Sequence, residues 1–442
     1  MKATALTLAT VLNSFAFASP SAPSPMPITA SPEVNPLSFA DGRITLSLED
    51  QTRFEFRENN FDFNNSVNSV NDDSWLLNRF RVGLLLKPTS WMSLYFQGQD
   101  SREIGSNRPN LPGQLGAEGD NPFDLRQAYL ELGDSKASSL SLKVGRQVLL
   151  YGDQRVIGPL DWSNISRTFD AVKLRWTVQD GLWVDAFASS VVVPDRSGFD
   201  QSDRDSVFSG IYAHLPNTGP QDMEIYLLHL NDEGHDDHFL TFGTHWKSVP
   251  EVLGNWDYEA EFAYQNGTAA GKDLSAFATY AEAGYTIPVS GKPRIGVEYS
   301  FGSGDKNAAD NDQGAFQNLF PTNHLHYGLM DLFSWSNLHD VALHLSAKPT
   351  KQITAGVDFH GFWLAETGDT WRRANAKTAV RPVSGSANSF AGTEVDVLVS
   401  WNPCASFSLT AGYSHFFAGN YLSSTGQDDD ADFVYLMTGI KF

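Results

Sequence analysis

The chain has a single cysteine, Cys404, among its 442 residues, so it cannot form an intramolecular disulfide. No Cys and His spacing typical of a metal site occurs either. After residue 18, no apolar run reaches the length of roughly 18 residues that a membrane-spanning helix needs. If this protein crosses a membrane, it must therefore cross with strands.

Positive charge is also scarce, since 31 Lys and Arg face 52 Asp and Glu, for a formal net charge of -21. Nucleic-acid binding depends on clustered cations, so this balance disfavours a nucleic-acid partner. The sequence lacks G-x-S-x-G, H-E-x-x-H and a phosphate-binding glycine loop. We therefore predict that the protein is not an enzyme and uses no cofactor or metal.

The first 18 residues, MKATALTLATVLNSFAFA, combine Lys2, an apolar core and a small-residue ending of the A-x-A type. This pattern indicates a signal peptide that is removed on export. Residues 19–38 are rich in proline and small residues, which predicts a flexible periplasmic tether. We expect the folded domain to span residues 39–442.

The chain then alternates between apolar and polar residues. From Ile44, apolar Leu46 and Phe54 share one face, and polar Arg53 and Glu55 share the other. Such runs recur, for example at 79–87, 256–265, 294–301, 353–360 and 394–401. A period of two residues indicates β-strands, and we count about 18 of them up to the C-terminus.

The connections between these runs alternate in length. Short turns such as KPTS and SGKP take turns with long connections at 102–123, 148–168, 302–336 and 365–390. Short turns on one rim and long loops on the other are typical of an outer-membrane, up-and-down antiparallel β-barrel. A secreted β-sandwich or a β-solenoid also alternates, but no fixed repeat period is found. We predict an all-β transmembrane barrel of about 18 strands.

Charge is unevenly spread over the polar face. Cations, among them Arg79, Arg81, Lys173 and Arg175, fall in the N-terminal part of the barrel. Carboxylates fall later, and we expect an opposing acidic wall at Asp257, Glu259, Glu261 and Glu298. A cationic wall concentrates anionic solutes in a low-dielectric pore. The pattern predicts an anion-selective lumen in an acidic protein.

Other chemistry is conceivable at these positions. Asp257, Glu259 and Glu261 share a face as a glycosidase pair would, but no aromatic sugar platform accompanies them, and an aqueous lumen needs polar residues there. His344 and His360 lack a third metal ligand of fitting spacing. The acidic loops DNDQG and DDDAD do not reproduce an EF-hand, so cation bridging by them remains a hypothesis.

Three segments between Asp124 and Trp176 carry a family resemblance: DLRQAYLELGD, LSLKVGRQVLLYGDQRVIGPLDWSN and SRTFDAVKLRW. The order of GRQ, YGDQR, DW and RTFD resembles the alginate export family of outer-membrane proteins. The resemblance implies an 18-stranded monomeric barrel with an arginine-rich constriction that passes a polyuronate outward. By matching position it implies that Arg126 and Arg146 are constriction residues and that Arg155 and Arg167 lie in loop motifs.

Strict alternation conflicts with two of these arginines. Arg126 shares parity with Leu130, and Arg146 shares parity with Val144, so both would face lipid. Pairing across the turn GDSKAS would bring the two arginines together, with Leu132 near Leu140. Because glycine readily forms a bulge that re-aims the following residues, we predict a bulge at Gly145 and an inward Arg146.

The sequence thus predicts a passive outer-membrane channel for an anionic, alginate-like polysaccharide or its oligomers, with lumen arginines as the path. A general or substrate-specific diffusion porin for small anionic solutes is the alternative. The expected partners are the solute, outer-membrane lipid and lipopolysaccharide, and a periplasmic export partner is compatible with this role. A barrel-borne polysaccharide hydrolase or lyase and an adhesion protein are the rival classes.

Overall fold

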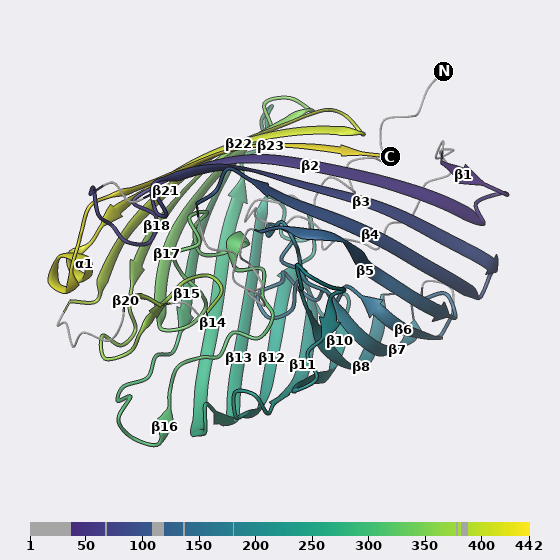
Figure 1. Ribbon diagram of the computed structural model, residues 1–442, viewed down its shortest axis with the longest axis horizontal. Coiled ribbons are helices and arrows are strands. Elements are labelled where there is room, and N and C mark those ends of the chain that lie inside the picture. The colour runs from purple at the N-terminus through teal and green to yellow at the C-terminus, as the bar shows by residue number, and fades with distance from the viewer. Residues whose placement is uncertain are drawn as a thin grey trace.

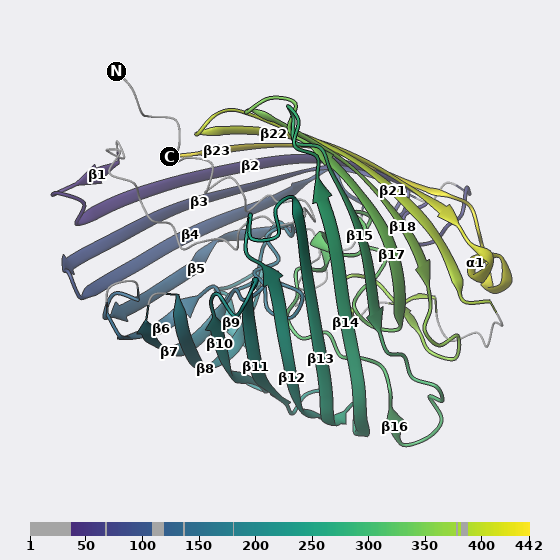
Figure 2. The same cartoon turned by 180° about the vertical axis from the view of Figure 1, so that it is seen from behind.

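The computed structural model describes residues 37–442 except 67–68, 108–118, 136–137, 180, 377–378 and 382–387. Residues 1–36, with the predicted signal peptide and most of the predicted tether, lie outside the described residues. Within the described part, one antiparallel sheet closes on itself as a barrel of 18 strands, and this confirms the predicted fold class. Figure 1 and the reverse view in Figure 2 show these strands arranged as a ring.

The barrel strands follow one another in chain order. They are β2 (Ile44–Glu58), β3 (Asp73–Thr89), β4 (Met92–Ile104), β5 (Asn121–Leu132), β6 (Leu140–Gln147), β7 (Phe169–Gln179), β8 (Leu182–Val193), β10 (Ser206–Leu215), β11 (Gln221–Asp232), β12 (Asp237–Ser248), β13 (Trp256–Ala269), β14 (Lys272–Thr286), β15 (Arg294–Gly302), β17 (Leu338–Ala347), β18 (Ile353–Trp363), β21 (Phe390–Cys404), β22 (Phe407–Ala418) and β23 (Ala431–Lys441). Pairing of β2 with β23 closes the ring.

Short elements decorate the connections. They are β1 (Ser38–Phe39), β9 (Gln201–Ser202), β16 (Asp312–Gln313), β19 (Trp371–Arg372), β20 (Ala379–Arg381), the 3-10 turn η2 (Asn323–Leu325) and α1 (Asn420–Thr425). No helix among the described residues is long and apolar enough to span a membrane. The long connections leave one rim, where β16 lies beside the start of β14 (Figure 1).

The alternation read from the sequence becomes an apolar outside and a polar inside. On β2 the outward Phe54 is 42% exposed, whereas the inward Arg53 is fully buried. On β15 the outward Val297 is 58% exposed, whereas the inward Glu298 is 3% exposed. Because lipid cannot hydrogen-bond with side chains and a lumen can, this arrangement suits a membrane barrel.

Two long loops fold into the barrel and join each other there. They cover residues 148–168, between β6 and β7, and residues 303–337, between β15 and β17. Ile157 forms a parallel bridge with Phe320, and the Gly158 amide donates to the Phe320 carbonyl at 2.7 Å. In the second loop Tyr327, Met330 and Trp335 are fully buried. The interior is therefore occupied by packed loops.

The orientation of Arg126 depends on a bulge in its own strand. Gln127 pairs with Gln97 and Leu125 pairs with Gly98, so Arg126 is an extra residue on β5. The register shift turns Arg126 inward, where its Nη1 donates to Gln97 Oε1 at 2.9 Å. The alternation of residues within one strand could not predict the inward orientation of Arg126, because a bulge depends on how two strands pair.

The predicted bulge at Gly145 and the inward Arg146 are wrong. β5 and β6 pair without a shift, with Leu132 opposite Leu142 rather than near Leu140, and Ala128 opposite Arg146. Arg146 stays on the outer face at the end of its strand, where its Nε lies 2.9 Å from Asp170 Oδ1. A guanidinium near the interface, with a carboxylate beside it, costs little.

Gly145 has a different role from the predicted one. Its φ of 122° lies in the region that favours glycine, and an added Cβ would lie 2.3 Å from the Ala128 carbonyl oxygen. Glycine therefore permits the close approach of β5 and β6 at this point.

Candidate translocation path

Five buried arginines form a strip on the inner face of the barrel between β2 and β5. The strip consists of Arg53 and Arg57 on β2, Arg79 and Arg81 on β3, and Arg126 on β5. Alternate residues of one strand share a face, and the register places Arg79 opposite Gln51 and Arg81 opposite Glu49. We call these five residues the arginine strip. The sequence also places Arg53 and Arg57 on the polar face, but the predicted path residues included only Arg79, Arg81 and Arg126 of this strip.

The arginine strip holds the two inward loops through their backbone. Arg53 Nη1 donates to the Trp162 carbonyl at 2.6 Å, and Arg57 Nη1 donates to the Met330 carbonyl at 2.9 Å. Arg79 Nη1 donates to the carbonyls of Asp161 at 2.8 Å and Ser163 at 3.0 Å. The guanidinium groups thus satisfy loop carbonyls that would otherwise be buried without partners.

Asp161, in the DW motif of the first loop, is the carboxylate at the centre of this strip. Its Oδ1 accepts from Arg81 Nη2 at 2.9 Å, from Arg126 Nη2 at 3.2 Å and from Ser166 Oγ at 2.8 Å. Burial would raise the pKa of the Asp161 carboxyl, but the guanidinium groups of Arg81, Arg126 and Arg79 outweigh burial and hold it well below its usual range. Asp161 is therefore ionised at neutral pH.

The two loop arginines that the resemblance marked also lie inside the barrel. Arg155 Nε lies 2.8 Å from Asp153 Oδ2, its guanidinium carbon lies 3.4 Å from the centre of the Tyr280 ring, and its Nη2 lies 3.6 Å from Glu298 Oε1. Arg167 Nη1 donates to the carbonyls of Gly158 and Pro321, at 2.9 and 3.0 Å, so it links the two loops. Both side chains are buried.

Lys173 and Arg175 face inward on β7 and share one carboxylate. Lys173 Nζ lies 3.3 Å from Asp185 Oδ2, and Arg175 Nε lies 2.6 Å from Asp185 Oδ1. Tyr151 of the first loop also donates to Asp185, at 2.8 Å. Both cationic side chains are 19% exposed, and the shared Asp185 carboxylate is fully buried. The sequence did not single out Asp185, although it has inward parity on β8.

The predicted acidic residues lie on inward positions of β13 and β15, roughly across the ring from β3. Glu261 accepts from Tyr226 at 2.6 Å, and Asp257 pairs with Arg294. Arg155 reaches Glu298 from the first loop. The cationic and acidic walls are therefore bridged by a loop, an arrangement that strand parity did not predict.

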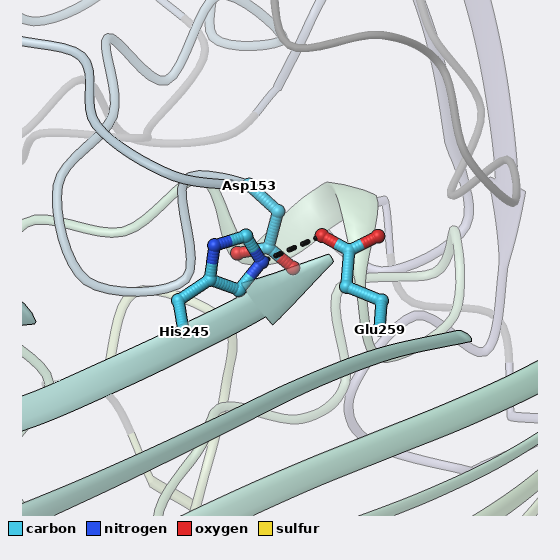
Figure 3. A group of neighbouring side chains, drawn as sticks. All are labelled: Asp153, His245 and Glu259. Atoms are coloured by element: carbon cyan, nitrogen blue, oxygen red, sulfur yellow. Dashed lines mark hydrogen bonds and ion pairs between the residues drawn. The ribbon is translucent and has the colours of Figure 1, made fainter. Parts of the chain in front are cut away.

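A group with metal-ligand chemistry lies beside this bridge. One ligand atom each of Asp153, His245 and Glu259 lie within 4.8 Å of one another (Figure 3). His245 Nε2 is 2.8 Å from Glu259 Oε1, and Lys247 Nζ is 2.9 Å from Glu259 Oε2. Because Asp153 also pairs with Arg155, each carboxylate already has a cationic partner. The geometry is that of an ion-pair network.

The second such group is Glu282, Glu298 and His344. Here Arg294 Nη1 lies 2.9 Å from Glu282 Oε1, and His344 Nδ1 lies 2.7 Å from Asp358 Oδ1. The ring centres of His344 and His360 are 5.7 Å apart, and His360 has its own partner in Asp340. The histidines that the sequence raised as a metal pair therefore bind separate carboxylates.

A closed barrel with an apolar outer face, charged inward residues and long loops folded inside defines an outer-membrane channel. Residues 43–435 match the family model described as Alginate export. The chain therefore belongs to the alginate export family. No curated protein shows significant sequence similarity to it.

Solved structures of outer-membrane porins from Pseudomonas aeruginosa share the fold. OccK9 (OpdG) superposes with a TM-score of 0.64 at 13% identity, over 90% of this chain and 98% of that one. OccD3 (OpdP) gives 0.61 at 11% identity, over 90% and 91%. OpdK, solved with vanillate, gives 0.60 at 12% identity, over 90% and 98%. At these identities the likeness concerns the fold alone.

Proposed function

We propose that this outer-membrane protein is a passive, anion-selective channel for an alginate-like polyuronate or its oligomers. The observation that supports the proposal most is the arginine strip, because five buried guanidinium groups gather on three strands of a chain whose net charge is -21. Such a local field can oppose the net charge of a whole protein. Family membership supports the same class of solute.

Transport along this path needs many weak sites. A polymer held tightly at one point would stall the chain behind it. Ion pairs that water screens contribute under about 1 kcal/mol each. The path therefore requires water to reach the arginines that the loops bury, and successive carboxylates then move from one arginine to the next. The path we propose comprises Arg79, Arg81, Arg126, Arg155, Arg167, Lys173 and Arg175, with Asp257, Glu259, Glu261 and Glu298 opposite. Arg146 is left out because it faces outward.

Diffusion of small anionic solutes is the second candidate function. Two observations favour it. The loops 148–168 and 303–337 occupy the interior and are joined by backbone hydrogen bonds, which narrows the passage. The fold is also shared with OpdK, which was solved with the small carboxylate vanillate.

The remaining parts of the proposal concern placement in the cell. Residues 1–18 act as a signal peptide, and residues 19–38 form a periplasmic tether. The barrel works as a monomer, since one chain closes the ring, and it contacts outer-membrane lipid and lipopolysaccharide. A periplasmic export partner is compatible with this arrangement.

The reversal potential across planar bilayers in a salt gradient tests the proposal. Arg126→Gln removes an inward charge, and Arg146→Gln, on the neighbouring strand, removes an outward one as a matched control. A unit charge about 7 Å from a passing anion in water contributes about 0.6 kcal/mol, so Arg126→Gln should lower anion over cation permeability roughly threefold. Arg146→Gln should leave it unchanged.

Equal selectivity in wild type and Arg126→Gln would refute the arginine path. The two candidate functions separate when mannuronate oligomers and vanillate are added in turn. Current block by the oligomers, deepening with their length, supports the polyuronate channel. Block by vanillate without any response to oligomers supports the small-solute porin.

A further inference from the structure

The contacts of Asp161 resemble those of a bound ligand carboxylate. One oxygen receives two guanidinium groups, from Arg81 and Arg126, and the Ser166 hydroxyl. The Asp161 side chain is 26% exposed, whereas the side chains of Arg81 and Arg126 are 5% and 7% exposed. The cationic partners are thus fixed in the wall, and the carboxylate lies at their water-facing edge.

This group of charges has more positive than negative members. Arg79, Arg81 and Arg126 surround Asp161, and the only other carboxylate that pairs with them among the described residues is Glu49, 3.3 Å from Arg81. Within the described part of the chain, the buried Nε atoms of Arg79 and Arg126 have no hydrogen-bond partner. The wall therefore offers more donors than Asp161 uses.

A small cavity borders this group. Arg126 and Ser166 line it together with Gln99, Asn121 and Thr168. Asp124 and Asp200 also border it, but their oxygens accept hydrogen bonds from the Leu125 amide and from Asn121 Nδ2, respectively. Arg126 and Ser166 thus border the same small cavity, which the first loop itself helps to line.

We propose that Arg81, Arg126 and Ser166 form a carboxylate-binding site that Asp161 fills in the absence of solute. A carboxylate of the transported solute displaces Asp161, and the segment 161–166 then leaves the arginine strip. This inference rests on the proposed function, since it assigns the carboxylate to the solute in the channel. Asp161 is then an internal competitor that keeps the loop docked until an anion arrives.

The neighbouring contacts define what must open together with Asp161. Trp162 lies flat between Arg53, whose guanidinium carbon is 3.6 Å from a Trp162 ring centre, and His324, at a ring distance of 3.7 Å. Ser163 is 2% exposed, and its carbonyl accepts from Arg79. These contacts adjoin Asp161 in the chain, so release of the segment 161–166 requires them to open when its carboxylate leaves.

Thiol labelling tests this displacement. Cys404→Ser removes the native thiol, which is exposed, and Ser163→Cys places a new one on the buried segment. The rate of modification by a membrane-impermeant maleimide is measured on the purified barrel in proteoliposomes. We expect mannuronate oligomers, and small carboxylates such as vanillate at higher concentration, to raise this rate at least tenfold. A neutral oligosaccharide of equal length should not raise it.

Substitution of Asp161 provides the complementary arm. In the Cys404→Ser, Ser163→Cys protein, adding Asp161→Asn should give the fast labelling rate without solute. Adding Ser166→Ala should give an intermediate rate, and it serves as the test if the Asp161→Asn protein folds poorly. Asp310→Asn, an exposed carboxylate in the other loop, is the control and should behave as wild type. A labelling rate that is insensitive to oligomers, or slow labelling of both Asp161→Asn and Ser166→Ala, would overturn the inference. Persistent anion selectivity in that case would leave the proposed function intact.

Discussion

Replacing Arg79 by methionine should release the first loop from the wall. Methionine keeps an unbranched apolar side chain in the buried space but removes every donor. Arg79 Nη1 donates to the carbonyls of Asp161 and Ser163 and to Ser166 Oγ, at 2.8, 3.0 and 3.0 Å. The substitution therefore removes this donor from the two carbonyls, whereas Ser166 Oγ keeps a second donor in Arg81 Nη2 at 2.7 Å.

The size of the effect follows from these bonds. A hydrogen bond to a charged group contributes about 1.5 to 3 kcal/mol. Water replaces part of this stabilisation once the loop opens, so we count only the two carbonyl bonds, each at the lower value. Together they contribute about 3 kcal/mol. Since each 1.4 kcal/mol is a factor of about ten, the undocked state of residues 160–168 should become roughly a hundredfold more populated.

Hydrogen exchange measured by mass spectrometry detects this opening. Two amides in the segment are protected by bonds inside the loop, from Ser163 to the Leu160 carbonyl at 3.0 Å and from Arg167 to the Pro159 carbonyl at 2.6 Å. Arg196→Met, an exposed arginine on another loop, is the matched control. If peptides covering 160–168 exchange in Arg79→Met as slowly as in wild type and in the control, the anchoring role is refuted.

Two further predictions concern other parts of the wall. Gly145→Ala should destabilise the pairing of β5 with β6, because the alanine Cβ would lie 2.3 Å from the Ala128 carbonyl oxygen. The barrel should then unfold at a lower temperature, which heat-dependent gel mobility measures. An unchanged unfolding temperature would contradict this. Burial and the Asp124 carboxylate raise the pKa of Asp200 from 3.8 to about 6. Between pH 3.8 and about 6 the Asp200 carboxyl is protonated in the folded loop but not in the unfolded chain, so the folded loop loses stability as the pH rises through this range. Amides of residues 194–205 should therefore show higher hydrogen-exchange protection factors at pH 5 than at pH 7.5. Asp200→Asn should abolish the difference.

The fold could be predicted from the sequence because a membrane barrel imposes a period of two on nearly every strand. On β2 and β15, parity alone placed Arg53 and Glu298 inside and Phe54 and Val297 outside. Parity held at Arg146, where the predicted bulge was wrong, and it failed at Arg126 for a specific reason. The extra residue on β5 appears only when Gln97 and Gly98 of β4 are paired with it.

The loop contacts could not be predicted for a related reason. Asp161 meets Arg81 and Arg126, and Arg155 meets Glu298, across separations that no local pattern encodes. The resemblance placed Arg155 and Arg167 in loop motifs, but it did not indicate that the loop fills the interior. The sequence therefore predicted which residues carry charge on the inner face, whereas their partners depend on how two long loops fold.

Flux of a defined oligomer through the protein tests the central claim most directly. Proteoliposomes loaded with a mannuronate oligomer, or with a neutral oligosaccharide of the same length, are assayed for release of each sugar, with protein-free liposomes as the baseline. We predict that the barrel releases the mannuronate oligomer faster than the neutral one. Equal release of both sugars, or no release of the mannuronate above the baseline, would contradict the account.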